Sequence, residues 1–521
     1  MYTPLSPTPA RLLLFCYLVC LGASSPNIVF VLTDDQDVEL HSLEHMPKLQ
    51  SLIADKGVEF KRMYASVPVC CPSRSSLYSS RYQHNNFVKG NAIPTNCSSA
   101  EWQSGPEKTS FPVYLQAAGY ATSFAGKYLN LYGDPKVGGV AHIPPGWTNW
   151  NGLVGNSVYY NYTISANGVR ETHKDQYSVD YLPDLVLNKT LAFLDSNAAS
   201  GKPFFVTLST PSCHGPQEAA PQYQGLFPDV KAPRTPRFNA TVENVHWLQS
   251  VKAIYPFDDN SAAFSDLVFR RRLQTLQSVD DMIEALVEKV SSLGQLNNTY
   301  FVYTADNGYH VGDFGFIYDK RQPWETDVHL PLLMAGPGIP PGTTTDAMVS
   351  MADLGATFLD IANAPIPSFY DGVSLLPAAQ GTGAPWPRQI ALVEYHGESW
   401  GPSGKDGACS LTDYDPSLAC APDGIYRTPP FFSGHPLCVC QDTANQTYNC
   451  LRVKNTSADF RYCEFVGTQP VEYFDYLQDP YELVNAVSSL SSDILAALSA
   501  RLAQVIGCQG AQCSALLSTS I

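Results

Sequence analysis

The chain has 521 residues, and its 32 basic and 48 acidic side chains give a formal net charge of −16. A hydrophobic share of 44% with a charged share of only 15% provides for a large buried core and excludes wholesale disorder. The acidity excludes a nucleic-acid binder, which needs a basic face, and taken alone it also disfavours an anionic substrate.

The first 25 residues have the pattern of a secretory signal peptide. Arg11 precedes an apolar run from Leu12 to Leu21, and small residues follow from Gly22 to Ser25. A membrane anchor is the alternative, but so short an apolar run does not span a bilayer, and no later stretch is long enough to do so. We therefore expect a protein of the secretory pathway, without a membrane span, that reaches the lysosome or the extracellular space.

Strands and helices are predicted to alternate through most of the remaining chain. A continuous apolar run at 27–33 is typical of a strand buried on both faces, and Gly57 ends a helical pattern over 46–56. Further helices are expected at 111–118, 179–194 and 264–293, and further strands at 120–124, 204–208, 300–304 and 331–334. This order predicts an α/β fold with a large, mainly parallel sheet between helices.

From about residue 386 the composition changes, so we expect a domain over 26–385 and a smaller C-terminal subdomain over 386–521. A strand at 390–395 and a helix at 490–505 enclose a region of cysteines and turn residues. Of the 14 cysteines, Cys16 and Cys20 leave with the signal peptide. Eight of the rest lie in this subdomain: Cys409, Cys420, Cys438, Cys440, Cys450, Cys463, Cys508 and Cys513. In a secreted chain this cluster predicts disulfides; zinc is disfavoured because partner Cys-x-x-Cys pairs and nearby histidines are missing.

Asn-x-Ser/Thr sequons recur along the chain and, behind a signal peptide, predict a glycoprotein. The sequon asparagines should then lie on the surface. They are Asn96, Asn161, Asn188, Asn239, Asn297, Asn445 and Asn455.

Two acidic clusters come directly after predicted strands. Asp34 and Asp35 follow the first strand, and Asp306 and Asn307 follow the strand at 300–304. Because ligands bind beyond the carboxyl ends of strands in open α/β sheets, these side chains are expected to converge. Ordinary turn chemistry is the alternative for either cluster alone. Together they predict a site for a hard cation, since carboxylate and amide oxygens are the ligands of Ca²⁺ and Mg²⁺.

A third segment, Cys70-Cys-Pro-Ser-Arg74, favours an anion site next to that cation. Pro72 suits the first turn of a helix, so Cys70 should lie at a helix N-terminus, where backbone N–H groups and the helix dipole favour negative charge. Arg74 adds a fixed positive charge. The alternative is that Cys70 and Cys71 are ordinary disulfide cysteines.

The pattern Cys70-x-Pro72-Ser73-Arg74, with the two acidic clusters, resembles the signature of the sulfatase family. Further segments resemble members that act on 6-sulfated N-acetylglucosamine units of glycosaminoglycans. They are Ala125–Asn130, Gly146-Trp147, Ser178–Leu182, Asp306–His310, Asp319–Arg321, Val393–Tyr395, Cys438–Cys440, Tyr462–Phe465 and the Cys508/Cys513 pair. The resemblance spans nearly all of residues 26–515. It implies an alkaline-phosphatase-like sandwich and a short antiparallel sheet in the C-terminal subdomain.

The resemblance also implies roles for individual residues. Cys70 would be oxidised to formylglycine by the formylglycine-generating enzyme before the protein folds. One Ca²⁺ would be held by Asp34, Asp35, Asp306 and Asn307, with residue 70 near or on the metal. Arg74 would position the formylglycine, and Lys127, His214 and Lys320 would contact the sulfate group. Many family members have a histidine where this chain has Leu129, and His310 is a possible substitute for it.

The chemistry implied is hydrolysis of a sulfuric ester. A formylglycine hydrates to a geminal diol; one oxygen attacks sulfur and displaces the alcohol, and the second hydroxyl then loses its proton and expels sulfate. Ca²⁺, Arg74 and the lysines would stabilise the charge on the sulfuryl oxygens. A histidine or lysine would protonate the departing alcohol.

Three alternatives remain open from the sequence. One is a metal-dependent phosphatase or phosphodiesterase, which usually attacks with Ser or Thr and is disfavoured by the Cys-x-Pro-x-Arg segment. Another is a catalytically dead, glycan-binding sulfatase homologue, which requires Cys70 in a disulfide; if Cys70 is modified instead, one of Cys71, Cys97 or Cys213 should be unpaired. The third is a secreted arylsulfatase of broader specificity.

Overall fold

The protein is described here from a computed structural model. It describes residues 25–519 apart from 251–256, 258, 383–385, 399–424, 428–437, 441, 443–445 and 468. The expected signal peptide and the expected bridges of Cys409 and Cys420 lie outside the described residues. Among the helices that are described, none is both long enough and apolar enough to cross a membrane.

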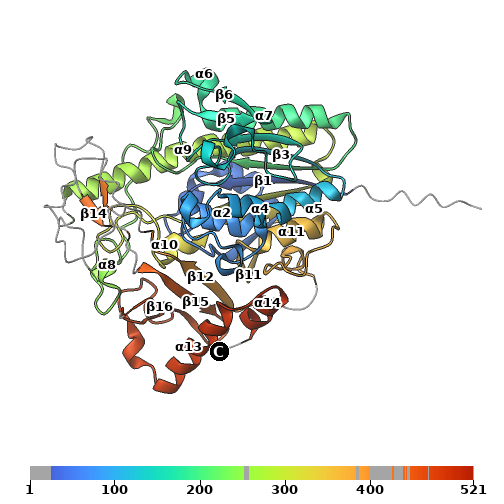
Figure 1. Ribbon diagram of the computed structural model, residues 1–521. Coiled ribbons are helices and arrows are strands. Elements are labelled where there is room, and N and C mark those ends of the chain that lie inside the picture. Colours follow the sequence, from blue (N-terminus) through green and yellow to red (C-terminus); the bar gives the residue numbers. More distant parts are fainter. Residues whose placement is uncertain are drawn as a thin grey trace, which may run out of the picture.

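A large mixed sheet forms the centre of the molecule (Figure 1). Its strand order is β11-β2-β10-β8-β1-β7-β3-β4-β5-β6, with β9 paired to β2. The strands are β1 (Asn27–Thr33), β2 (Val58–Tyr64), β3 (Ala121–Lys127), β4 (Asn149–Leu153), β5 (Thr163–Ala166), β6 (Val169–Thr172), β7 (Phe204–Ser209), β8 (Thr299–Ala305), β9 (His329–Leu330), β10 (Leu332–Ala335) and β11 (Thr343–Ser350). The middle of the sheet, β8-β1-β7-β3-β4, is parallel throughout, whereas β10 and β5 run antiparallel to their neighbours.

Helices cover both faces of this sheet. One face packs against α1 (Pro47–Leu52), α7 (Leu182–Ala198) and the long α9 (Asp259–Ser292). The other packs against α2 (Cys70–Ser79), α4 (Ala100–Ser104), α5 (Phe111–Ala117) and α11 (Asp353–Ile361). The short helices are α3 (Gln83–Asn86), α6 (Tyr177–Asp180), α8 (Trp247–Ser250), α10 (Glu325–Val328) and α12 (Leu376–Ala379).

Strand β1 shows why an uninterrupted apolar run forms the centre of such a sheet. Side chains alternate between the two faces of a strand. Phe30 therefore packs in the core on the α5 and α11 side, while Val29 and Val31 pack on the α7 and α9 side. Both faces are covered by helices, so no position of β1 needs a polar residue, and all seven residues are buried.

A second, antiparallel sheet lies near the C-terminus, with the order β12-β15-β16-β17. Its strands are β12 (Ile390–Tyr395), β15 (Tyr448–Lys454), β16 (Asp459–Phe465) and β17 (Glu472–Asp475), and α13 (Ser492–Val505) and α14 (Ala511–Ser518) pack on it. Strands β13 (Ile425–Arg427) and β14 (Cys438–Cys440) form a separate pair. Disulfides join Cys450 to Cys463 and Cys508 to Cys513. These two bridges bear out part of the expected disulfide framework.

The expected fold class is confirmed: a mainly parallel sheet between helices, followed by a small antiparallel sheet. Two helices begin at other residues than the sequence pattern predicted. The helix expected at 179–194 begins at Leu182, because Pro183 suits the first turn of a helix. The helix expected at 264–293 begins earlier, at Asp259.

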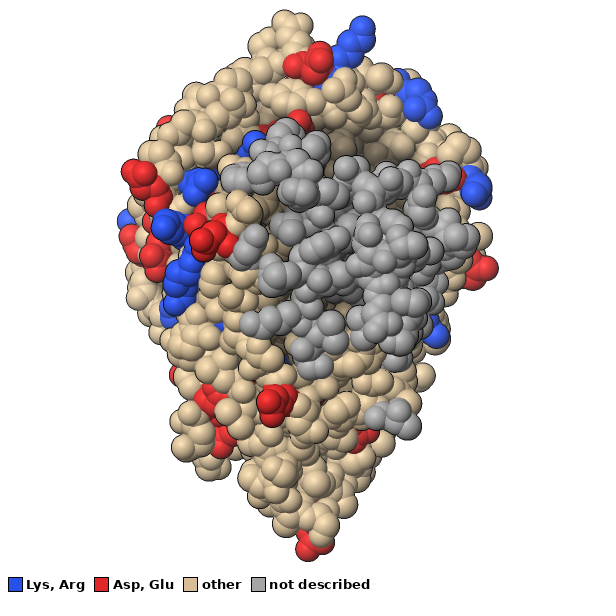
Figure 2. Space-filling view, turned by 90° about the vertical axis from the view of Figure 1, so that its left-hand side faces the viewer, with Lys and Arg blue, Asp and Glu red and all other residues tan. Residues whose placement is uncertain are grey.

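Charged side chains of both signs lie on the described part of one face of the molecule. On the face shown in Figure 2, basic and acidic side chains are interspersed, and the described part of this face carries no broad basic patch. The sequon asparagines that the structure describes are exposed or partly exposed, as expected.

One contact between helix α3 and the C-terminal sheet should make stability depend on pH. The His84 ring lies 2.8 Å from a Glu394 carboxylate oxygen and 3.0 Å from the Cys508 carbonyl oxygen, with Asp371 nearby and the Tyr82 ring stacked on it. Burial opposes the protonated ring, but Glu394 and the carbonyl outweigh it and raise the pKa of His84. A raised folded-state pKa stabilises the fold below the unfolded value of about 6.5, and the stabilisation is lost as pH rises through the folded value.

We therefore expect His84→Gln to lower the free energy of unfolding by about 1.5–3 kcal/mol at pH 5.5 and by clearly less at pH 9. Denaturant unfolding at the two pH values measures this difference. His41→Gln is the control, because His41 is largely exposed beside Glu44. An equal loss for His84→Gln at both pH values would show that the protonated ring contributes nothing.

Candidate active site

Four parallel strands bring the predicted site residues to one edge of the sheet. Strands β8, β1, β7 and β3 are neighbours in that order, so their carboxyl ends lie side by side. Asp306 and Asn307 follow β8, Asp34 and Asp35 follow β1, His214 lies in the loop after β7, and Lys127 ends β3. The convergence expected from sequence is therefore present.

The oxygen donors of the predicted cation site are fully buried and adjacent. Asp35 accepts a hydrogen bond from the Asn307 side-chain amide at 2.8 Å, and the Asp35 backbone N–H donates to Asp306 at 3.1 Å. The Asn307 side-chain oxygen is buried and has no hydrogen-bond partner. Three carboxylates and a spare amide oxygen are the donor set that Ca²⁺ takes, so these residues fit a calcium ion.

The three buried carboxyl groups have pKa values that are shifted in different directions. Burial acts to raise the pKa of Asp34, but Lys127, His214 and Arg74 outweigh it and hold that pKa well below its usual value. Burial likewise opposes ionisation of Asp35, and Lys320 and His214 lower its pKa. Asp306 differs: burial, with the negative charge of Asp34, raises its pKa to about 6. Two of the three carboxylates are thus held ionised by nearby cations.

Helix α2 presents Cys70 at its first position. The helix is buried along its whole length, and Val69 precedes it in extended conformation. The Cys70 sulfur lies 3.7 Å from an Asp34 carboxylate oxygen. Ligand atoms of Asp34, Asp35, Cys70 and His214 all lie within 4.8 Å of one another. Burial raises the pKa of the Cys70 thiol to about 12, so an unmodified thiol at this place stays protonated and is a poor nucleophile.

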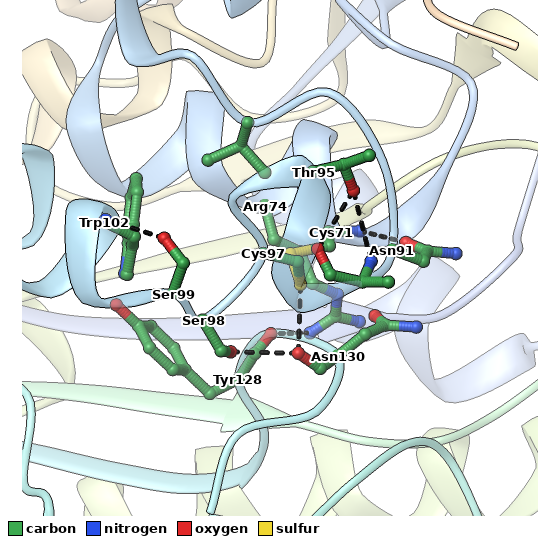
Figure 3. The surroundings of a disulfide bond; sticks show 12 residues. Cys71, Arg74, Asn91, Thr95, Cys97, Ser98, Ser99, Trp102, Tyr128 and Asn130 are labelled. Atoms are coloured by element: carbon green, nitrogen blue, oxygen red, sulfur yellow. Dashed lines mark hydrogen bonds between the residues drawn. A yellow bond between two sulfur atoms is a disulfide. The ribbon is translucent and has the colours of Figure 1, made fainter. Parts of the chain in front are cut away.

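Arg74 lies one helical turn after Cys70 and ties several strand ends together. Its Nε donates to Asp306 at 2.7 Å, and one Nη donates to the Lys127 carbonyl at 2.7 Å and to the Ser209 hydroxyl at 2.8 Å. Figure 3 shows the guanidinium reaching the backbone at Tyr128. The other Nη is buried without a hydrogen-bond partner, 3.8 Å from Asp34. Arg74 therefore keeps one donor for a further anionic group.

A disulfide fixes the start of α2 and decides which cysteines are unpaired. Cys71 is bonded to Cys97, as Figure 3 shows, and the Cys71 backbone N–H donates to the Asn91 side chain at 2.9 Å. Cys70 and Cys213 are free and buried among the described cysteines. The alternative of Cys70 locked in a disulfide is therefore not supported, and Cys213 is the unpaired cysteine that the odd count required.

Two lysines reach the acidic residues, one from the end of β3 and one from the segment between β8 and α10. Lys127 donates to Asp34 at 2.6 Å, and Lys320 donates to Asp35. Both are almost completely buried. Burial acts to lower the pKa of Lys320, but Asp35 outweighs it and raises that pKa well above its usual value. Ser157, which nothing in the sequence singled out, also donates to Asp34.

His214 joins this group, whereas His310 does not. The His214 Nε2 lies 3.9 Å from Asp35, and burial lowers the pKa of the ring. The His310 ring is fully buried between Phe316 and Trp324, and its Nδ1 lies 2.9 Å from an Asp327 carboxylate oxygen.

His310 is therefore placed apart from the group it was expected to serve, and we assign it no contact with the reacting atoms. Leu129, at the position of the missing family histidine, is buried in the hydrophobic core. These two placements leave His214 as the histidine of the cluster around Cys70 among the described residues.

A cavity of about 330 Å³ opens beside this group. Asp35, His214 and Lys320 of the site line it, and α9 contributes apolar side chains, among them Leu267 and Val268. The remaining lining is Asn91, Asn156, Gly215, Pro216, Gln217, Phe264, Arg271, Tyr309, Tyr318, Asp319 and Arg321. A cavity of this size, with charged and apolar side chains in its lining, takes a small ligand or one sugar ring.

Some residues of the site are not indicated by any sequence pattern, because only the tertiary fold brings them next to it. Ser157, Ser209 and Asn91 belong to no motif and come from loops or strand ends far apart in the chain. In the Asp319-Lys320-Arg321 segment, the family resemblance implies a role for Lys320 alone. The run of three charged residues in a mostly apolar region is the signal that could have indicated Asp319 and Arg321 as well.

Comparison with known proteins gives consistent matches. A family profile described as Sulfatase matches residues 26–364. N-acetylglucosamine-6-sulfatase of Homo sapiens is 42% identical over 522 residues, which are 98% of this chain and 90% of that protein. The protein of that name from Capra hircus is 42% identical over 509 residues, which are 95% of this chain and 87% of that protein.

A similar fold is also known from solved structures. One, a protein in complex with its substrate D-glucosamine-2-N,6-O-disulfate, superposes with a TM-score of 0.70. The match covers 93% of this chain and 97% of that chain at 22% sequence identity, which shows a shared fold.

Proposed function

The chain belongs to the sulfatase family, and from this premise we propose that it removes 6-O-sulfate groups from N-acetylglucosamine units of glycosaminoglycans such as heparan or keratan sulfate. The observation that carries the proposal is the buried group around Cys70. Three cations, Arg74, Lys127 and Lys320, surround the carboxyl edge of the sheet beside a cavity of about 330 Å³. The substrate assignment is supported by the N-acetylglucosamine-6-sulfatases, which are 42% identical to this chain over nearly its whole length.

The net charge of −16 does not oppose this assignment. Net charge governs long-range steering and solubility, whereas a binding site depends on its local charges. Part of the acidic count, Asp34, Asp35 and Asp306, lies in the proposed calcium site. A cation there, next to three basic side chains, makes the pocket attractive to a sulfate ester.

In the proposed mechanism, residue 70 is formylglycine and Ca²⁺ is held by Asp34, Asp35, Asp306 and Asn307. When present, the hydrated aldehyde supplies one hydroxyl as nucleophile and another for release of sulfate, and the metal supplies a Lewis acid. Because Cys70 is completely buried once the chain has folded, we propose that the formylglycine-generating enzyme acts on the unfolded chain. The described disulfides fit maturation in an oxidising compartment.

The chain's own residues bind and orient the ester. The free Nη of Arg74 and the ammonium groups of Lys127 and Lys320 donate to sulfuryl oxygens and stabilise the negative charge that grows on them. Arg74 also fixes the ends of the strands that carry Asp306 and Lys127. His214, which lines the cavity, or Lys320 donates a proton to the oxygen of the leaving sugar alcohol.

A substrate panel tests the assignment. We expect kcat/KM for N-acetylglucosamine 6-sulfate to exceed that for N-acetylgalactosamine 4-sulfate and for 4-nitrophenyl sulfate by about tenfold or more, because the cavity can contact a sugar ring beyond the sulfate. Hydrolysis of the aryl ester without hydrolysis of the sugar sulfate would replace the assignment with that of an arylsulfatase. Hydrolysis of a phosphate monoester faster than any sulfate ester would contradict the reaction itself.

A further inference from the structure

The loop that carries Lys320 is held in an unusual backbone conformation. Asp319 has φ 148° and Arg321 has φ 90°, both in the region that non-glycine residues avoid. Both flanking side chains are buried, and the Lys320 ammonium donates to Asp35. Backbone in such a conformation persists only when the surrounding structure determines it, so the contacts that impose it are informative.

One set of contacts comes from the same domain. His310 and Asp319 exchange backbone hydrogen bonds, at 2.8 Å from the His310 N–H and 3.2 Å from the Asp319 N–H. The Gln322 N–H donates to the Asp327 carboxylate at 2.8 Å, and this carboxylate also binds the His310 ring. The pair of His310 and Asp327 thus fixes both ends of the segment 319–322, which gives buried His310 a positioning task.

The other set comes from the C-terminal sheet and its neighbouring residues. The Tyr448 hydroxyl donates to the Arg321 carbonyl at 2.9 Å, and the Gln446 amide donates to the Gln322 side chain at 2.7 Å. The Arg321 Nε donates to Glu398 at 3.2 Å and lies 3.8 Å from Asp442.

Glu398 also connects this loop to the start of α2. Its other carboxylate oxygen accepts from the Asn91 backbone N–H at 2.5 Å, and the Asn91 side chain binds the Cys71 N–H. Asp442 in turn accepts from the Glu398 backbone N–H at 2.9 Å and from the Tyr395 hydroxyl at 2.8 Å. The segments that carry Lys320 and Cys70 are therefore held against each other by residues that follow β12.

From these contacts we propose that Tyr448, Glu398 and Asp442 form a clamp that positions Lys320. The C-terminal sheet then acts as part of the catalytic apparatus without touching the reacting atoms. Tyr448 and Arg321 are positioning residues: they fix the backbone on either side of Lys320 so that its ammonium group stays beside Asp35. This inference rests on the proposed function for the role of Lys320, whereas the clamp itself is a property of the fold.

Tyr448→Phe is the sharpest test, because it removes one hydroxyl and leaves a buried ring of the same shape. We expect faster amide hydrogen exchange at Asp319 and Gln322 and a fall of about three- to tenfold in kcat/KM, mostly in kcat. Tyr462→Phe is the matched control: Tyr462 is buried in the neighbouring strand β16, and its hydroxyl donates to Glu464, away from the loop. It should change neither measurement.

The same substitution is then made in a Lys320→Ala background. If the clamp acts through Lys320, Tyr448→Phe should lower kcat/KM by less than about twofold in the Lys320→Ala background, because the side chain that Tyr448 positions is already absent. An equal loss in both backgrounds, or unchanged exchange of the loop amides, overturns the inference, and so does full activity of Lys320→Ala. A wild-type protein that hydrolyses no sulfate ester refutes the proposed function instead, while the exchange measurement still decides the clamp.

Discussion

Replacing Cys70 by serine should reduce steady-state hydrolysis of a sulfate ester by at least about a thousandfold while the protein remains folded. The sulfur is completely buried 3.7 Å from Asp34, and a serine hydroxyl fits the same space and can donate to that carboxylate. A serine oxygen is able to attack sulfur once. It offers no second hydroxyl to release the sulfate, so a covalent sulfate ester should accumulate on residue 70.

The measurement combines steady-state assays of sulfate-ester hydrolysis with mass spectrometry of the peptide that contains residue 70. Wild-type protein should show formylglycine at this position, and the serine variant incubated with substrate should show an added sulfate. Cys70→Ala is the control, since it can neither attack nor retain sulfate. Turnover by Cys70→Ser at the wild-type rate, or an unmodified cysteine in active wild-type protein, would contradict the formylglycine mechanism.

Replacing Asp35 by asparagine should abolish calcium binding and lower kcat/KM by at least about a hundredfold. The Asp35 carboxylate lies between Asn307 and Lys320, so it contributes to the proposed cation site and also orients a sulfate-binding lysine. Asparagine keeps the shape but removes the charge. Elemental analysis should find one calcium ion per wild-type chain and none in the variant, and chelation of the wild type should lower activity in a way that added Ca²⁺ restores.

Asp37→Asn is the matched control on the same segment. Asp37 is also fully buried, but its carboxylate accepts hydrogen bonds from the Leu40 N–H at 2.6 Å and from Arg272 at 3.5 Å, whereas the Asp35 carboxylate accepts from Asn307 and Lys320. This variant should keep its calcium and most of its activity. If Asp35→Asn keeps its calcium, the metal is not held by Asp35; if chelation leaves activity unchanged, the metal has no part in the reaction.

The fold was predictable where one residue pattern dominates. The apolar run of β1 needs helices on both faces, and the periodic apolar residues of α9 need a sheet beneath them, so both elements and the parallel sheet were expected from sequence. In the large sheet, strands β2, β4, β5, β6, β9 and β11 were not predicted. They are short or carry polar and half-exposed residues, and they owe their form to pairing with neighbours that a local pattern does not reveal.

The site was predictable where its residues stand next to one another or at the ends of recognisable strands. Asp34, Asp306 and Cys70 belong to this class, and so does Arg74, which lies one turn after Cys70 on the same helix. The placement of His310 could not be foreseen. A histidine three residues after Asn307 is equally able to face the site or the interior. The His310 ring lies in the interior because it packs against Trp324 and is hydrogen-bonded to Asp327.

By itself the sequence determined the fold class, the secretory pattern, the family, and the short segments that carry the acidic clusters and the Cys70 to Arg74 motif. These properties depend on periodicity and on residues close together in the chain. Only the tertiary structure decided that Cys71 pairs with Cys97, that Ser157 reaches Asp34, and that residues after β12 hold the Lys320 loop. Such contacts join segments far apart in sequence, and the packing of separate elements, which no local pattern encodes, brings them together.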